Sequence, residues 1–308
     1  MRVACIDIGT NSVLLLVAER APGGEVRAVV ERTAITRLGQ GVDATGELAP
    51  EARERTLQCL AQYAAEAQNL GASRILAVGT SAMRDARGGT DFAREAAAVL
   101  GEAPRVISGD EEARLTFQGA LSGLRLPLGP SLVFDVGGGS TELIVGQVSR
   151  EGLVLERAIS LDVGSVRLTE RYLRSDPPDP GEIAALQAEV DRQLAAFPPA
   201  PGASLVGVAG TVTTLAAMAQ EVVPYDGARI HGLNLATAEV AQLARRLVLL
   251  PVEARRRLPG LEPKRADVIA AGALLVERLL RWGGWPRLVV SDRGVRWGLA
   301  LEALSGGL

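Results

Sequence analysis

Two short turns in this sequence carry the residue types that bind phosphate. The first has the sequence DIGTNS at residues 7–12, and the second has DVGGGS at residues 135–140. Glycine and small hydroxyl residues leave the main-chain N–H groups of such a turn open to an anion, because few side chains block the approach. Asp7 and Asp135 precede the turns at predicted strand ends, where a carboxylate can hold a magnesium ion against the same phosphate.

The two turns are copies of one pattern, because the aspartates at 7 and 135 lie 128 residues apart (135 minus 7), about the length of one domain. Apolar, β-branched runs flank each turn and predict two β-hairpins, one from 3–8 and 13–18 and the other from 132–136 and 143–148. A plain turn with an Asx hydrogen bond explains either copy alone equally well. The repetition favours the phosphate-binding interpretation.

A third candidate for anion binding is the sequence AGTVTT at residues 209–214. A strand predicted at 205–209 runs directly into a helix through Gly210 and Thr211. The first N–H groups of a helix have no partner within the helix, so this junction can bind an anion. Thr211 acting only as an N-cap explains the same pattern.

Strand-like and helix-like segments alternate along the chain, which predicts an α/β fold. A length of 308 residues favours two domains. The repeat places them at 1–122 and 123–294, with a terminal helix at about 295–308 that we expect to pack on the first domain.

The composition excludes several classes of protein. The net charge of −3 argues against binding polyanions through bulk positive charge, so any anion site must be local. Two cysteines, Cys5 and Cys59, and one histidine, His231, cannot form a disulfide framework or a multi-histidine metal site. The sequence contains no apolar run of the roughly 18 residues that a transmembrane helix needs. We therefore expect a cytoplasmic protein that uses oxygen-ligated magnesium, with manganese as an alternative.

The motifs, taken in order, resemble those of the exopolyphosphatase and guanosine pentaphosphate phosphatase family. This resemblance implies two actin-like (ribonuclease H-like) domains with a phosphate-binding cleft between them, in a short form that lacks the C-terminal HD-type domain of many members. It covers nearly the whole chain. Besides the two turns and AGTVTT, the matching runs are TSAMRDA at 80–86, ISGDEEA at 107–113, GSVRLTER at 164–171, HGL at 231–233 and SDRGVR at 291–296.

The resemblance implies a role for individual side chains. Glu112, chosen over Glu111, is predicted to act as the base that orients or deprotonates the attacking water, although both also suit the first turn of a helix. Asp135 and Glu142 complete the acidic cluster, and Asp7, Asp135 and Glu142 are the predicted metal ligands. The predicted phosphate-binding residues are Gly9, Thr10, Asn11, Ser12, Arg84, Gly137, Gly138, Gly139, Ser140, Gly210 and Thr211, with Arg37 and Arg293 as weaker contacts that could equally be surface ion-pair partners.

The predicted activity is hydrolysis of the terminal phosphate of inorganic polyphosphate, a phosphoric anhydride hydrolase reaction. A guanosine pentaphosphate 5′-phosphohydrolase is the first alternative, since both substrates end in a phosphoanhydride. An ATP-dependent kinase and a non-catalytic actin-like binding protein are further alternatives. The family resemblance also makes a homodimer reasonable, whereas His231 either contacts substrate or is structural.

Overall fold

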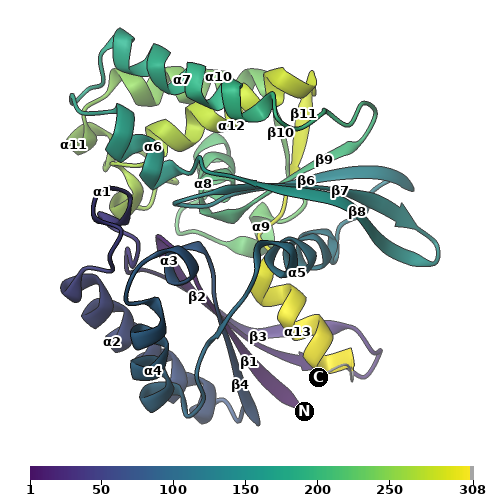
Figure 1. The fold of residues 1–308 in the computed structure, drawn as a ribbon. Helices are drawn as coiled ribbons and strands as arrows, with labels where there is room; N and C mark the ends of the chain where they lie inside the picture. The colour runs from purple at the N-terminus through teal and green to yellow at the C-terminus, as the bar shows by residue number, and fades with distance from the viewer. Residues whose placement is uncertain (306–308) are drawn as a thin grey trace. The chain divides into compact units, whose positions relative to one another are not determined.

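The computed structural model describes residues 1–305 of the chain, which divide into two compact units (Figure 1). The first unit comprises Met1–Gly119 together with the chain from Gly294 onward, and the second comprises Ala120–Arg293. Each unit contains one β-sheet with helices packed on it, so the predicted α/β class is confirmed. No helix within residues 1–305 combines the length and the hydropathy that crossing a membrane requires.

The first unit is built on a five-stranded sheet with the order β3-β2-β1-β4-β5. Strands β1, β2 and β3 form an antiparallel meander, and β4 and β5 are parallel to β1. The predicted first hairpin is therefore present, and its turn lies at the end of the sheet where β4 also ends. The strands are β1 (Arg2–Ile8), β2 (Ser12–Arg20), β3 (Val26–Ile35), β4 (Arg74–Gly79) and β5 (Arg105–Val106).

Successive side chains of β1 point to opposite faces of this sheet. Ala4 and Ile6 are buried in the hydrophobic core formed with α2 and α4, whereas Val3 and Cys5 are buried in the core formed with α5 and α13. Asp7 follows Cys5 in this alternation and so projects from the face that α5 covers. The helices are α1 (Val42–Thr45), α2 (Pro50–Asn69), α3 (Ser81–Asp85), α4 (Gly89–Leu100), α5 (Gly109–Leu121) and α13 (Val295–Ser305); residues 306–308 of the predicted terminal helix lie outside the described residues.

The second unit repeats this topology in a six-stranded sheet with the order β10-β11-β9-β6-β7-β8. Strands β6, β7 and β8 form the antiparallel meander, and β9 is parallel to β6 as β4 is to β1. The strands are β6 (Gly129–Val136), β7 (Thr141–Ser149), β8 (Gly152–Leu161), β9 (Ser204–Val208), β10 (Asn234–Ala236) and β11 (Arg287–Val290).

The main hydrophobic core of the second unit lies on one face of its sheet. Leu132, Phe134 and Val136 of β6 pack there against residues of the helices, while Asp135 projects from the opposite face. The helices are α6 (Ser165–Tyr172), α7 (Pro180–Leu194), α8 (Ala209–Ala219), α9 (Gly227–Ile230), α10 (Thr237–Leu249), α11 (Val252–Arg255) and α12 (Ile269–Gly283), with a 3₁₀ turn at Pro263–Arg265.

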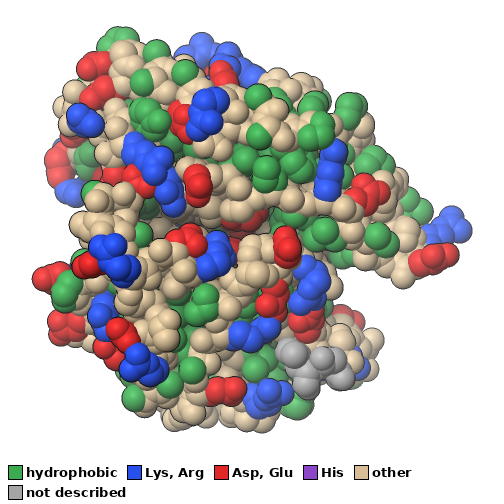
Figure 2. Space-filling view, in the orientation of Figure 1, with side chains coloured by type: hydrophobic (Ala, Val, Ile, Leu, Met, Phe, Trp, Pro, Cys, Tyr) green, Lys and Arg blue, Asp and Glu red, His purple; other side chains and the backbone are tan. Residues whose placement is uncertain are grey.

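Acidic and basic side chains are interspersed over the face of the molecule that Figure 2 shows. This mixture agrees with the small net charge of −3. A site for a polyanion must therefore come from local groups rather than from a surface of one sign.

Candidate active site

The turn between β1 and β2 is held so that its N–H groups face outward. Gly9 donates its N–H to the Ser12 carbonyl at 3.0 Å and closes the turn. The carbonyls of Thr10 and Asn11 accept hydrogen bonds from Gly39 and Arg37, at 2.9 and 3.0 Å. In a trans peptide the C=O of one residue and the N–H of the next point in opposite directions, so the N–H groups of Asn11 and Ser12 point away from the 37–39 segment.

The turn between β6 and β7 is closed by the matching hydrogen bond, from Gly137 N–H to the Ser140 carbonyl at 3.0 Å. Main-chain N–H groups at the start of α6 donate to the carbonyls of this turn. Ser165 N–H donates to the Gly137 carbonyl at 3.0 Å, and Val166 N–H donates to the Gly138 carbonyl at 2.9 Å.

The N–H groups of the residues that follow, Gly138 and Gly139, therefore point away from α6. No main-chain carbonyl within residues 1–305 accepts either of them. Consecutive outward N–H groups of this kind form an anion-binding concavity, which is the geometry that the sequence predicts for both turns.

The first unit brings Glu112 and Arg84 together. The Arg84 guanidinium lies 3.0 Å from the Glu112 carboxylate, and it also donates to the Ile107 carbonyl at 3.2 Å. The Glu112 residue is only 8% exposed. Glu111, by contrast, points to the more exposed Arg105, with which it forms an ion pair. Of the two glutamates that the sequence leaves as candidates for the base, Glu112 is thus the one held beside a predicted phosphate ligand.

Further polar groups surround the turn of the first unit. The hydroxyl oxygens of Thr10 and Ser81 are 2.9 Å apart, which joins the turn to the start of α3. Arg37 has a φ angle of 55°, a left-handed conformation that is costly for a residue with a side chain. Such strained residues cluster at functional sites, and this one is bonded directly to the turn.

Asp135 and Glu142 are directly opposite each other in the β6–β7 ladder, so their side chains share one face of the sheet. Ser160 donates its hydroxyl to Glu142 at 2.8 Å, and Glu142 is 3% exposed. Asp7 lies in the other unit, and no group of three or more His, Cys, Asp and Glu side chains within residues 1–305 is arranged to hold a metal ion. Two carboxylates still fit magnesium, which keeps several waters and binds substrate phosphates directly.

The junction between β9 and α8 carries the third predicted anion site and a residue that sequence reasoning missed. Ala209 has a φ of 68° at the start of α8, so the backbone is strained where the strand turns into the helix. The Arg265 guanidinium packs against Gly210 so closely that a β-carbon there would lie 2.2 Å from Nη1.

A cation is unfavourable at a helix N-terminus. Burial lowers the pKa of Arg265, although part of its side chain remains at the surface. The positive helix end and the guanidinium together suit an anion.

Comparison with known proteins identifies the family of this chain. The model of the Ppx/GppA phosphatase family matches residues 16–306. The chain belongs to the Ppx/GppA phosphatase family. It is similar to exopolyphosphatase 2 of Mycobacterium tuberculosis, with 41% identity over 317 residues and coverage of 98% of each chain. The family predicted from the motifs is therefore confirmed.

Solved structures agree with this assignment. The crystal structure of a family member from Aquifex aeolicus has a TM-score of 0.83 and 34% identity, covering 100% of this chain and 99% of the other. An exopolyphosphatase-like protein has a TM-score of 0.92 and 33% identity over the whole length of both chains. This Ppx/GppA protein thus shares the family fold over its entire length.

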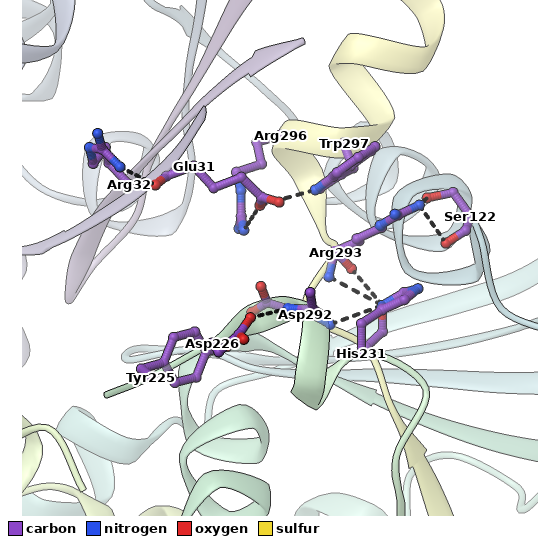
Figure 3. Close-up of polar contacts among 12 residues, drawn as sticks. Glu31, Arg32, Ser122, Tyr225, Asp226, His231, Asp292, Arg293, Arg296 and Trp297 are labelled. Carbon is purple, nitrogen blue, oxygen red and sulfur yellow. Dashed lines mark hydrogen bonds and ion pairs between the residues drawn. The ribbon is translucent and has the colours of Figure 1, made fainter. Parts of the chain in front are cut away.

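Figure 3 shows the contacts of two predicted residues of this Ppx/GppA protein, Arg293 and His231, which belong to the second unit. Arg293 donates from Nη1 to the carbonyl and the hydroxyl of Ser122, at 3.0 and 3.2 Å. His231 accepts from the Asp292 N–H at 3.4 Å, and its Nδ1 is 3.3 Å from the Ser291 hydroxyl. Both side chains hold the segment that follows β11, and a role in phosphate binding stays a prediction for Arg293.

In the first unit, Figure 3 shows Glu31 between two side chains of α13. Its carboxylate accepts from Arg296 at 2.6 Å and from the Trp297 indole at 3.2 Å. These contacts fasten the terminal helix to β3.

Proposed function

We propose that this chain is an exopolyphosphatase, which removes the terminal phosphate of inorganic polyphosphate by attack of water. The observation that carries this proposal is the pair of matching turns. In each turn the main-chain carbonyls accept hydrogen bonds of 3.1 Å or less, and the N–H groups of the residues that follow these carbonyls point outward. Each turn by itself is suited to bind a phosphate group. The 41% identity to a protein named exopolyphosphatase 2 supports polyphosphate as that substrate.

Glu112 is the residue that we assign to the attacking water. Hydrolysis of a phosphoanhydride needs a positioned water and neutralised charge, with little covalent help from the protein. The Glu112 carboxylate can accept a proton from water, and Arg84, at 3.0 Å, fixes its position. Arg84 can also neutralise charge on the transferring phosphoryl group. One partly buried ion pair would thus place both groups that the reaction needs.

Asp135 and Glu142 would hold magnesium, with Asp7 as a further predicted ligand. When bound, the ion would supply positive charge to the phosphoryl oxygens. The Ser160 hydroxyl donates a hydrogen bond to the Glu142 carboxylate at 2.8 Å. This bond fixes the orientation of the carboxylate before a ligand binds. Three further predictions belong to this proposal: manganese can replace magnesium, the protein forms a homodimer, and its location is cytoplasmic.

Phosphate release from polyphosphate, guanosine pentaphosphate and ATP tests the proposal, with equal concentrations of terminal phosphate and with magnesium present. We expect the highest kcat/KM with polyphosphate. A preference for guanosine pentaphosphate would replace polyphosphate by the nucleotide as the substrate of the same site. Absence of phosphate release from all three compounds would refute the proposal in favour of a kinase or a binding protein.

A further inference from the structure

Strand β8 (Gly152–Leu161) is an exposed edge of the sheet in the second unit. Its ladder is with β7, and the residues from 152 to 157 are all exposed. Three consecutive apolar side chains are among them, since Leu153 is 40% exposed, Val154 56% and Leu155 36%. Figure 1 shows the β7–β8 hairpin extending beyond the helices of its unit. An exposed edge strand with apolar side chains can pair with a further strand.

The corresponding edge strand of the first unit is held by helices of its own unit. Strand β3 is the third strand of the meander there, as β8 is in the second unit. Glu31 of β3 accepts from α13, and Arg32 forms an ion pair with Glu66 of α2 at 2.7 Å. Val29 and Val30 pack against the hydrophobic core. In β8, by contrast, the apolar side chains that reach a core are the last two of the strand.

A β-bulge divides β8 into two parts. Leu155 is paired with Gly146 and Arg157 with Val145, so Glu156 is the additional residue of the bulge. Paired residues of an antiparallel ladder share one face of the sheet, and the faces alternate along a regular strand. Gly146 and Val145 are neighbours and point to opposite faces. Leu155 and Arg157 therefore lie on opposite faces as well, so the bulge shifts the alternation of β8 by one residue.

Two opposite charges, Glu156 and Arg157, lie side by side at the centre of β8. Arg157 lies over the Phe197 ring at 4.8 Å and donates to the Pro198 carbonyl at 3.2 Å. Glu156 accepts from the Gln147 amide at 3.0 Å. Gln147 is two residues from the β7 partner of Arg157, so both charges lie on the same face of the sheet. All of these partners are uncharged, and both charged residues are exposed.

A two-fold axis between Glu156 and Arg157 would pair β8 with the same strand of a second copy. Residues that face each other in this register have numbers that add up to 313, since 156 plus 157 is 313. Glu156 of each copy would lie opposite Arg157 of the other. Val154 would lie opposite Ile159, so that an exposed apolar side chain meets an apolar one. The ends of the strand follow the same sum, because 152 plus 161 is also 313.

The bulge is what permits this register. Two numbers that add up to 313 differ by an odd number, and residues separated by an odd number point to opposite faces of a regular strand. Such residues cannot be partners in an antiparallel ladder, because partners share a face. The shift of one residue at Glu156 places them on the same face again. A regular strand could pair with its own copy only with a central residue facing itself, which would bring like charges together.

We infer that β8 is the homodimer surface of this protein and joins two copies in one continuous antiparallel sheet. The inference deepens the proposed function, because it assigns a surface to the homodimer that belongs to that proposal, and it does not depend on the reaction. Opposite charges across a ladder stabilise the pair, whereas like charges destabilise it. The order of Glu156 and Arg157 thus selects a second copy over a strand that lacks this pattern.

Charge reversal at each of the two positions tests the surface and the register together. Sedimentation equilibrium of the full chain, over about a hundredfold range of concentration up to about 500 µM, measures the dimer Kd. Glu156→Arg places two positive charges opposite each other, and Arg157→Glu places two negative ones. We expect each to raise Kd about tenfold or more. Arg150→Glu is the matched control, because it changes the charge of the same hairpin outside β8, and it should leave Kd unchanged.

Mixing the two reversed variants provides the decisive comparison. At positions 156 and 157 one chain is then positive and the other negative, so the mixed dimer should form with a Kd within about threefold of the wild-type value. A wild type that stays monomeric at the highest concentration would overturn the inference. A dimer that neither reversal weakens, or reversals that mixing does not rescue, would overturn it as well.

Phosphate release from polyphosphate, measured on the same wild-type sample, tests the reaction separately. A dimer with the expected charge dependence but without phosphate release would leave the inference standing while the proposed reaction fails. Phosphate release by a monomer would have the opposite meaning. Circular dichroism of each variant checks that the fold is kept.

Discussion

The two turns of this Ppx/GppA protein share their hydrogen bonds but differ in the side chains around them. Gly9 and Gly137 make the same 3.0 Å bond to the serine that ends the turn. Opposite the aspartate of each first strand, however, the first unit has Leu14 and the second has Glu142. Under the proposed function, repeating the backbone would supply two places for phosphate, whereas the differing side chains would divide the chemistry.

This division assigns one part of the reaction to each unit. The first unit holds the Glu112–Arg84 pair beside its sheet, and the second holds the two carboxylates of Asp135 and Glu142 on one sheet face. A duplicated phosphate site needs only matching backbone geometry, because every phosphate in the chain presents similar oxygens. In the proposed function the base and the metal site would each occur once, so the copies would diverge there.

The largest expected effect comes from Glu112→Gln, which removes the base assigned to the first unit. The amide keeps the size of the side chain but cannot accept the proton of water, so phosphate release should fall roughly 100-fold to 10,000-fold. Initial rates with polyphosphate measure this, and circular dichroism checks that the fold is kept. Glu111→Gln is the control and should keep most of the rate. Full activity in Glu112→Gln would move the base elsewhere.

Glu142→Gln tests the metal site that we assign to the second unit. The amide is a poorer ligand than a carboxylate, so the magnesium concentration for half-maximal rate should rise at least about tenfold. The equivalent change in the other copy, Leu14→Gln, should leave this magnesium dependence unchanged. A similar magnesium dependence in both variants would show that the division between the units is wrong.

Two glycine substitutions compare how the turns are held. A β-carbon at Gly164 would lie 2.4 Å from the Gly138 carbonyl oxygen, whereas one at Gly39 would lie 2.3 Å from the Thr10 methyl group. Backbone cannot rotate away as a side chain can, so Gly164→Ala should cost about 1–3 kcal/mol of unfolding free energy. Gly39→Ala should cost about 1 kcal/mol, because it disturbs the Thr10–Ser81 contact. Urea unfolding measures both, and a larger loss in Gly39→Ala would contradict the comparison.

The smallest effect is expected at the strand ahead of the first turn. Cys5 is equivalent to Val133 in the second copy, because 133 minus 128 is 5, and both are buried. Burial raises the pKa of the Cys5 thiol to about 12, so almost no reactive thiolate exists at neutral pH. Cys5→Val should keep wild-type activity, and Cys5 should resist alkylation in the folded protein. Rapid labelling by iodoacetamide, followed by mass spectrometry, would contradict this.

The sequence predicted the strands and helices with clear apolar patterns. Both predicted hairpins were found, and the strand predicted at 205–209 is β9 (Ser204–Val208). The third strands β3 and β8 were not predicted, because edge strands leave many side chains exposed and lose the alternating pattern.

The sequence singles out candidate site residues where they lie together in one short motif. The turns and the aspartates before them could be identified because each lies in one short motif. Arg265 could not, because it lies 55 residues after Gly210 (265 minus 210) and only folding brings its guanidinium to the start of α8. An arginine next to a lysine, as Arg265 is to Lys264, carries no pattern that separates it from a surface residue.

The central claim is that each of the two turns binds phosphate through its main-chain N–H groups. Amide chemical shifts of the full chain, selectively labelled with ¹⁵N at glycine and serine, measure this directly during titration with tripolyphosphate and magnesium. The account predicts shifts at Ser12, Gly138, Gly139 and Ser140, with Gly202 and Gly284 unaffected as distant controls. Shifts confined to one turn, or absent from both, would contradict it.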